Sequence, residues 1–369
     1  MPLTLDDLRR FTVARTLFPP TTLRRAVHRM GFVQADPIRA PARAQDLTLR
    51  HRVRGYRAGD LERRFGELGI EEDFFVTYGF VTAEIQALMH PRSEVGVPAD
   101  APLPWPAARR KKAALLLDFV RERGEAHPRD VDAHFSHGTV ENYWGGSSNA
   151  TTHLLDAMHY RGLLRVARRE SGIRIYAAHR HEPAPAAAAE RRARVDALVD
   201  VAVRLYAPLP GRSLSYLVRR LRFAVPQWRQ ELTAALQRAR ERLAQARVAG
   251  IDWYWPVEED PSAGALPPPG VRLLTPFDPI VRDRDRFELL WGWVYRFEAY
   301  TPAPKRKLGY YALPVLRGHR VIGWGNLSLK VGKLEAAFEY TGTAPRSRDF
   351  KRELEGELSS MRVFLGLPP

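Results

Sequence analysis

The sequence contains no cysteine and no long apolar run. Without cysteine the chain cannot form disulfides, use a thiolate nucleophile, or hold zinc or an iron–sulfur cluster through sulfur. The longest apolar candidate, residues 113–120, is far shorter than the roughly 20 residues that a membrane-spanning helix needs. The start, MPLTLDDLRR, has two acids where a secretion signal has a basic and then an apolar segment. We therefore expect a cytoplasmic protein without a membrane partner.

Acidic residues are few relative to basic ones. The chain has 42 Asp and Glu against 58 Lys and Arg, which gives a formal net charge of +16. Such a surplus favours a polyanionic partner, because each neutralised phosphate releases condensed counterions. Nucleic acid is the first interpretation and an anionic membrane surface the second. A GC-rich genome that encodes Arg in place of Lys would give the same enrichment without any partner.

The 369 residues are too many for one hydrophobic core, and the patterns along the chain predict four domains. Residues 1–92 read as a winged-helix-like unit with two helices and the short strand VQAD. Residues 107–181 show three helices and then a basic hairpin around Glu-Ser-Gly, the order of a winged helix. A linker of residues 93–106, rich in proline, separates these two units.

The second half of the sequence follows the same order less clearly and then changes character. Residues 191–275 predict a third winged-helix-like unit, with a long helix over 227–247 followed by the extended segments IDWYWPV and VRLLTPF. Residues 276–369 alternate with period two in YRFEAYT, LGYYALPVL and HRVIGWGNLSL, and then close with a helix over 347–365. The fold class expected is mainly α with β (α+β): tandem winged-helix units plus a small C-terminal β-domain.

The segment VQADP holds the most informative polar pair. Pro37 disfavours helical geometry at Asp36, and alternation along a strand would then place Gln34 and Asp36 on the same face. A carboxylate on a phosphate-binding surface repels the ligand, unless positive charge develops in the substrate. Loss of an alkylated purine develops such charge on the sugar, which a carboxylate stabilises while it or the amide positions water. The alternative is that Asp-Pro simply begins a turn.

Basic residues around this pair are the candidate DNA contacts, because Arg and Lys bind phosphate oxygens. They follow the motif, flank the predicted hairpin, or lie in the C-terminal region: Arg39, Arg43, Arg50, His51, Arg52, Arg54, His153, Arg168, Arg169, Lys305 and Arg306. Scattered histidines more commonly belong to ordinary surface, and the lysine-rich run is equally well explained as a solvated strand edge. No histidine spacing matches a zinc enzyme, so we expect no metal.

Three blocks of the sequence resemble the bacterial winged-helix DNA glycosylases, the AlkZ/YcaQ-like family. They are VQADPIRAPARAQDLTLR, WGGSSNATTHLLDAMHYRGLLRVARR, and LLTPFDPIVRDR with YRFEAYTPAPKRKLGYYALPVL. Asp36 places the chain with the Gln-apolar-Asp branch, which is associated with crosslinks of the nitrogen-mustard type. The sequence departs from the family's pattern at Ala35, RAQD and IGWGNLSLK. These differences bear on the range of substrates.

The resemblance implies that the tandem winged helices surround a basic concave channel. It implies excision of alkylated bases from double-stranded DNA and unhooking of interstrand crosslinks, without a cofactor. It also implies that Gln34 and Asp36 are the catalytic residues. Three unlike basic units in one chain favour a monomer surrounding the duplex in the nucleoid. The alternatives are a non-catalytic winged-helix regulator and a charge-driven structural binder. Both predict that Asp36→Asn is harmless or even tightens binding.

Overall fold

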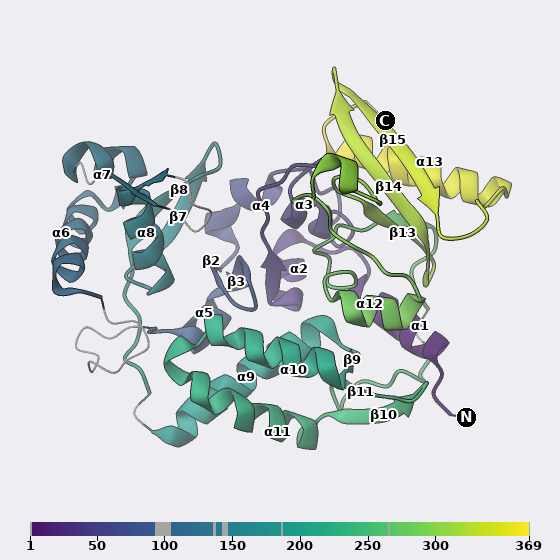
Figure 1. The fold of residues 1–369 in the computed structure, drawn as a ribbon, viewed down its shortest axis with the longest axis horizontal. Helices are drawn as coiled ribbons and strands as arrows, with labels where there is room; N and C mark the ends of the chain where they lie inside the picture. Colours follow the sequence, from purple (N-terminus) through teal and green to yellow (C-terminus); the bar gives the residue numbers. More distant parts are fainter. Residues whose placement is uncertain are drawn as a thin grey trace. The chain divides into compact units, whose positions relative to one another are not determined.

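The computed structural model describes residues 2–92, 105–135, 138–141, 147–185, 187–264 and 266–368. The chain divides into two compact units, each taking up more than one stretch of sequence. Unit 1 holds residues 1–63, 199–219 and 236–369, and unit 2 holds residues 64–198 and 220–235. Both combine helices with small antiparallel sheets, so the fold is α+β, as predicted (Figure 1). The four predicted domains do not coincide with these units, and that division stays a prediction.

The elements of unit 1 come from both ends of the chain. Its helices are α1 (Leu5–Thr16), α2 (Leu23–Met30), α3 (Ala44–Leu49), α4 (Asp60–Arg63), the second part of α9 (Ala188–Tyr206), most of α10 (Gly211–Arg220) and of α11 (Leu232–Arg242), α12 (Arg284–Trp291), η4 (Ala303–Lys305) and α13 (Arg348–Phe364). Its strands are β1 (Phe32–Gln34), β9 (Leu209–Pro210), β10 (Ala244–Val248), β11 (Ile251–Trp255), β12 (Val271–Leu273), β13 (Leu313–Arg317), β14 (Arg320–Lys330) and β15 (Lys333–Tyr340).

The elements of unit 2 lie mostly in the middle of the chain. Its helices are η1 (Phe65–Glu67), α5 (Ala83–Met89), α6 (Ala107–Arg123), α7 (Pro128–Phe135), α8 (Ala150–Tyr160), the first part of α9 (Ala188–Tyr206), η2 (Leu221–Phe223) and η3 (Pro226–Glu231). Its strands are β2 (Ile70–Phe74), β3 (Tyr78–Thr82), β4 (Glu125–Ala126), β5 (Thr139–Glu141), β6 (Ser147–Asn149), β7 (Leu164–Glu170) and β8 (Ile173–Ala178).

The two predicted N-terminal helices are confirmed, and the structure shows which residues begin and end them. Thr4 and Asp7 form a capping box on α1, in which each side chain accepts the other's backbone N–H. Thr22 caps α2, and Gly31 ends it with a φ of 70°, a conformation that glycine adopts without steric cost.

The C-terminal sheet of unit 1 has the antiparallel order β12-β13-β14-β15, and α13 lies beside it (Figure 1). The backbone N–H of Leu273 donates to Glu357 of α13 at 2.8 Å. The predicted strand YRFEAYT is wrong, because this segment forms no strand. There the buried Glu298 carboxylate accepts backbone N–H bonds from Lys307 and Leu308 and holds an irregular loop instead. Helix α12 was not predicted, whereas the closing helix α13 is confirmed, with Ser347 as its N-cap.

The predicted long helix over 227–247 is also corrected by the structure. It consists of η3 and α11 and ends at Arg242, after which β10 begins. Ala249 and Gly250 both have positive φ angles, 50° and 78°, and two such residues make the tight turn that joins antiparallel strands. Residues 244–248 therefore pair with β11.

The region over 107–181 follows the predicted order of helices and hairpin in unit 2. Helices α6, α7 and α8 are followed by the hairpin β7-β8, which turns at Ser171 and Gly172, and β4 completes a sheet of order β4-β8-β7 (Figure 1). Asn149 caps α8, as predicted, although residues 147–149 also form β6, paired with β5. The predicted turn at residues 145–146 and most of the 93–106 linker lie outside the described residues.

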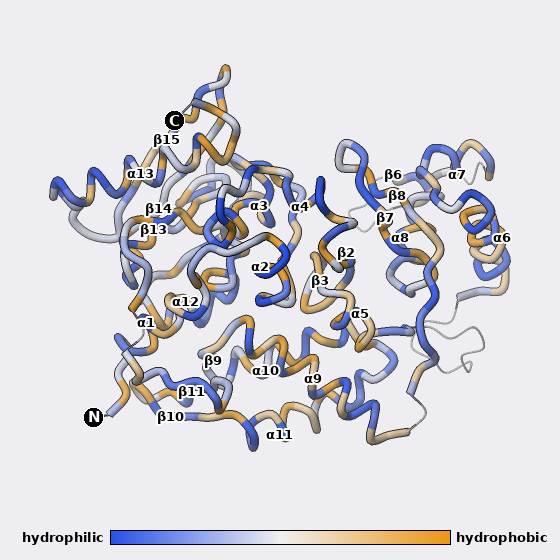
Figure 2. Tube along the Cα trace, turned by 180° about the vertical axis from the view of Figure 1, so that it is seen from behind, coloured by the Kyte–Doolittle hydropathy of each residue, from blue (hydrophilic) through white to orange (hydrophobic). Residues whose placement is uncertain are grey.

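Hydrophobic and hydrophilic residues alternate along the helices, as amphipathic helices on a core require (Figure 2). In unit 2 the buried faces of α6 and α8 pack with β7 and β8 around Leu116, Leu155, Met158 and Val166. In unit 1, Val13 of α1 and Leu17, which follows the helix, share a core with Leu274, Phe287 and Leu316. Within the described parts of the chain, no helix is long and apolar enough to cross a membrane.

Candidate active site

The chain leaves the β-strand between the two residues of the predicted catalytic pair. Strand β1 ends at Gln34, so the predicted strand through Asp36 is wrong. The Asp36 carboxylate accepts the backbone N–H of Ile38 at 2.9 Å, an Asx turn, and Pro37 offers no N–H to continue a ladder. Gln34 therefore belongs to a rigid strand end and Asp36 to the turn that follows it.

Gln34 is held by a residue that lies 248 positions later in the chain. The Arg282 Nε donates a hydrogen bond to the Gln34 Oε1 at 2.8 Å, and both residues belong to unit 1. Gln34 is half-buried, and the Arg282 guanidinium lies over the Tyr206 ring, 5.3 Å from its centroid. The amide side chain therefore has a fixed orientation rather than a free surface rotamer.

The segment that carries Arg282 is itself anchored by a buried ion pair. Arg52 donates to both carboxylate oxygens of Asp278, at 2.8 and 3.1 Å, and neither side chain is exposed. Arg52 also donates to the carbonyl oxygens of Thr16 and Thr48. Two parallel charge-assisted bonds fix both position and orientation, so this pair joins the N-terminal helices to the Arg282 segment.

Asp36 is half-buried, and the structure records no ion pair for it within the described residues. Its backbone N–H lies 3.4 Å from the Oε1 of the buried Gln45. The Nε2 of Gln45 lies 3.5 Å from the Glu62 carboxylate, which also pairs with Arg43. Burial raises the pKa of the Asp36 carboxyl, and the hydrogen bond from Ile38 offsets this only in part. A carboxylate in this setting is favoured by any positive charge that approaches it.

Four aromatic residues form a cluster whose outer ring is exposed. The Phe297 ring lies 5.1 Å from Phe277, 5.4 Å from Tyr311 and 6.0 Å from Tyr300, all nearly edge to face. Tyr311 is buried, but Tyr300 is 76% exposed. Burial raises the pKa of both tyrosines, and the charge of Asp36 raises them further. The cluster therefore lies within electrostatic reach of Asp36.

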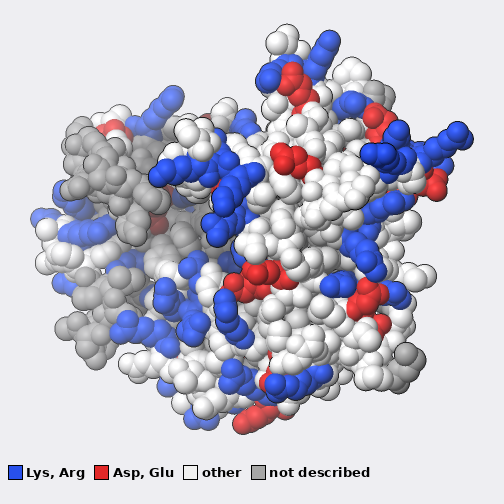
Figure 3. All heavy atoms as spheres, turned by 45° about the vertical axis from the view of Figure 1, so that its right-hand side comes forward, with Lys and Arg blue, Asp and Glu red and all other residues white. Residues whose placement is uncertain are grey.

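Five of the predicted DNA contacts have exposed side chains: Arg39, Arg54, His153, Arg168 and Lys305. Arg168 pairs with Glu125 and Glu170 while remaining 49% exposed. Arg306 is half-buried and donates to the Thr301 carbonyl. Lys and Arg side chains are spread over the face shown in Figure 3, with acidic side chains in a few separate groups.

Three other predicted contacts lie in the interior of unit 1. Arg52 is fully buried with Asp278, Arg50 pairs with Glu357 at 2.7 Å, and His51 Nε2 lies 3.0 Å from the Leu273 carbonyl oxygen. Their side chains are at most 5% exposed, so no phosphate reaches them in this structure. They connect the N-terminal region to β12 and α13, and we omit them from the proposed DNA contacts.

The remaining two predicted contacts are engaged with acids. Arg43 pairs with Glu62 and is 14% exposed, and Arg169 pairs with Glu72 of β2 and is 15% exposed. Each guanidinium therefore already has a carboxylate partner, and little of its surface is available to a phosphate.

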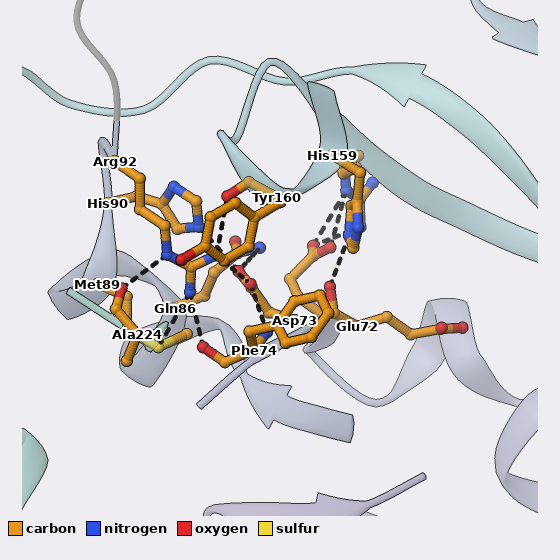
Figure 4. Close-up of polar contacts among 12 residues, drawn as sticks. Glu72, Asp73, Phe74, Gln86, Met89, His90, Arg92, His159, Tyr160 and Ala224 are labelled. Carbon is orange, nitrogen blue, oxygen red and sulfur yellow. Dashed lines mark hydrogen bonds and ion pairs between the residues drawn. The ribbon is translucent and has the colours of Figure 1, made fainter. Parts of the chain in front are cut away.

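Unit 2 contains a second polar cluster, which the sequence did not indicate. Arg92 and His90 both point toward the Asp73 carboxylate, at 2.6 and 2.8 Å (Figure 4). Burial alone would raise the pKa of Asp73, but the positive charge of Arg92 and the contact with His90 hold it well below its usual range. The His90, His181 and His179 rings are stacked at 4.1 Å spacing. Across the described residues no three His, Asp or Glu side chains are arranged to hold a metal ion.

The candidate site thus combines an anchored amide with a half-buried carboxylate for which no ion pair is recorded among the described residues, and an exposed aromatic ring lies within electrostatic reach. The model of the AlkZ-like DNA glycosylase family matches residues 27–364, and the chain belongs to this family of DNA glycosylases. Among solved structures, Streptomyces sahachiroi DNA glycosylase AlkZ has a similar fold, with a TM-score of 0.64 at 14% identity. The match covers 100% of this chain and 99% of that one.

Proposed function

We propose that this DNA glycosylase hydrolyses the N-glycosidic bond of purines alkylated at N7 or N3 in double-stranded DNA, and that it unhooks interstrand crosslinks. The observation that carries the proposal is Asp36, a half-buried carboxylate with no ion-pair partner among the described residues, beside an anchored Gln34. Burial disfavours the ionised form of such a group, and positive charge that forms next to it stabilises that form. The motif lies inside the part of the chain that matches the glycosylase family.

The proposed chemistry needs neither a metal nor an organic cofactor. An N7- or N3-alkylated purine is already cationic, so it leaves with the bonding electron pair while the sugar acquires oxocarbenium character. The Asp36 carboxylate stabilises that cation and takes the proton of the attacking water, and Gln34 positions the water. The products are the free base and an abasic site.

The exposed basic residues Arg39, Arg54, His153, Arg168 and Lys305 are proposed to bind the phosphates of the duplex. As part of the same proposal, the element order of α6 to β8 is that of a winged helix, with the exposed His153 on α8 available to the DNA. We further propose that the enzyme acts as a monomer in the cytoplasm, on the nucleoid, where its substrate is found.

Single-turnover release of modified base tests the proposal. The substrates are duplexes with one N7-methylguanine or one nitrogen-mustard crosslink, and the proteins are wild type, Asp36→Asn, Gln34→Ala and the control Asp349→Asn. Asp349 is 64% exposed, so its substitution makes the same chemical change at an ordinary surface acid. We expect abasic sites from wild type and Asp349→Asn, and a loss of at least about a hundredfold in Asp36→Asn with DNA binding retained.

The outcomes separate the readings of the chain. Release from the N7-methylguanine duplex alone would confine the enzyme to monoadducts. If wild type releases base from neither substrate at any enzyme concentration, the proposed substrates are wrong. A non-catalytic DNA-binding regulator then becomes the better account of the same basic surface.

A further inference from the structure

The contact between Arg282 and Gln34 determines which end of the amide faces which way. The Arg282 Nε lies 2.8 Å from the Gln34 Oε1. A guanidinium carries five N–H donors and no acceptor, so an amide NH₂ turned toward it would place donor against donor. The oxygen must therefore face Arg282, and the amide nitrogen with its two N–H donors lies on the other side.

Arg282 is held firmly enough to impose this orientation. Its backbone N–H donates to the Asp278 carbonyl at 2.9 Å, and Asp278 is fixed by the buried Arg52. The fully buried Arg286 donates to the carbonyl of Ile280 at 2.9 Å, and the Asp283 side chain caps α12. Side chains on both sides of Arg282 thus secure the backbone of this segment.

The geometry points to Arg282 as a positioning residue that makes Gln34 a hydrogen-bond donor in the glycosylase reaction. This inference rests on the proposed function and gives each of the two motif residues a separate role in it. A water molecule accepts an N–H bond from Gln34 and donates its proton to the Asp36 carboxylate, leaving a lone pair for C1′. The O–C1′ bond forms, the C1′–N bond breaks, the electron pair leaves with the base, and the proton goes to Asp36.

The substitution Gln34→Glu tests the donor role directly. Glutamate has nearly the same size, keeps an oxygen for Arg282, and removes both N–H donors. We expect the single-turnover rate on the N7-methylguanine duplex to fall by at least about tenfold, as in Gln34→Ala, because removing a preorganised donor typically costs this much or more. Retention of the wild-type rate within about threefold would show that Gln34 acts through its oxygen, and would overturn the inference.

The negative charge that Gln34→Glu adds requires its own control. A second carboxylate close by would raise the pKa of Asp36, and that effect alone would disappear as the pH rises. A missing donor lowers the rate at every pH. Rates measured from neutral to alkaline pH therefore separate the two causes: a uniform loss supports the inference, and full recovery at high pH contradicts it.

A double-mutant cycle tests whether Arg282 acts through Gln34. We expect Arg282→Met to lower the rate about tenfold in the wild-type background and less than about twofold in the Gln34→Ala background, because Gln34→Ala has already removed the group that Arg282 positions. Arg282→Lys, which keeps the charge and a donor, should restore part of the rate. Equal losses in both backgrounds would show that Arg282 binds DNA or merely supports the fold.

The same measurements keep this inference apart from the proposed function. If wild type releases no base, the proposed function fails. If wild type is active and the cycle is additive, or Gln34→Glu is fully active, only the donor role fails. Thermal unfolding of every variant shows whether a lost rate comes from a lost fold.

Discussion

Two aspartates of this enzyme show how differently a protein can treat the same carboxylate. Asp73 in unit 2 is fully buried, with Arg92 and His90 at hydrogen-bonding distance. Asp36 in unit 1 is half-buried, with a backbone N–H from Ile38 and no ion pair recorded within the described residues. The pKa of Asp73 lies well below its usual range, and that of Asp36 is raised.

The difference separates a structural charge from one that is available for chemistry. The positive charge of Arg92 and the hydrogen bond with His90 are supplied by the fold itself, so the interactions of Asp73 are complete before any substrate arrives. No such partner is recorded for Asp36 in the part of the chain that the structure describes, and a cationic substrate can supply one. Burial alone would not have distinguished them, because the more deeply buried carboxylate is the more firmly ionised one.

The largest expected effect is on stability, at Asp73. Asp73→Asn leaves the buried Arg92 without its anion, and breaking a buried pair from one side typically costs about 3–5 kcal/mol. Urea unfolding followed by circular dichroism measures this loss, with Asp349→Asn as the exposed control. A loss below about 1 kcal/mol would contradict the structural role given to Asp73.

The second largest effect should be a loss of stability in acid, caused by the histidines around Asp73. Burial lowers the pKa of His90, His179 and His181 to about 4, each further depressed by a neighbouring positive group. Below about pH 6.5 the unfolded chain takes up protons that the folded chain rejects, so stability is complete above that pH and falls toward about pH 4.

Urea unfolding at neutral pH and at about pH 5, between the folded and unfolded pKa values, measures this acid effect. His181→Phe, which keeps a ring in the stack but cannot be protonated, should show a smaller difference between the two pH values than wild type does. An unchanged difference would mean that other groups cause the acid sensitivity.

The aromatic rings near the two aspartates give a third, smaller expectation. The Tyr160 ring faces Arg92 at 4.8 Å, whereas Tyr300 near Asp36 is 76% exposed. An exposed ring near the proposed catalytic carboxylate can stack on a base, which is worth about 1–3 kcal/mol. We expect Tyr300→Ala to weaken lesion-DNA affinity or rate about tenfold without loss of stability, and Tyr300→Phe to retain activity.

Tyr216, which is 44% exposed on α10, provides a matched control for this measurement. Fluorescence titration of duplexes with and without the lesion compares the variants. If Tyr216→Ala and Tyr300→Ala behave alike, the ring at Tyr300 has no special part in recognition.

The smallest expected effect is a gain in stability at Asp36, opposite in sign to the loss expected at Asp73. Because the pKa of Asp36 is raised in the fold, its stabilising contribution exists only at low pH and is lost as the pH rises through that pKa. Asp36→Asn should therefore match or exceed wild-type stability at neutral pH, by less than about 1 kcal/mol. The gain should shrink in acid, and a clear loss of stability at neutral pH would mean that Asp36 also supports the fold.

Local patterns predicted the helices well because their signals lie within a few residues. Thr22 and Gly31 mark both ends of α2, and Ser347 begins α13. The strand predicted through Asp36 was wrong, since period-two alternation does not reveal an Asx turn. The strand predicted over YRFEAYT was wrong for a similar reason. This segment forms a loop because Glu298 accepts backbone N–H bonds from Lys307 and Leu308, which a local pattern does not reveal.

The site was predicted only where its residues are adjacent in the sequence. Gln34 and Asp36 were found from a motif and a resemblance, and their catalytic role remains a prediction. Arg282 lies inside a block that the resemblance singled out, but no spacing rule connects it to Gln34. Nor could charge alone show that Arg52 is buried with Asp278 while Arg54 is exposed.

Because the ion pair of Arg52 and Asp278 joins distant parts of the chain, it bears on when the candidate site is completed during synthesis. Ribosomes deliver the N-terminal end first, and domains generally fold as they emerge. Gln34 therefore leaves the ribosome long before Arg282, and all of unit 2 is synthesised in between. An unfinished chain that stops short of Asp278 already contains Gln34 and Asp36, but it lacks the residue that orients the amide. Catalytic competence on this account arrives late in translation, after most of the chain has been made.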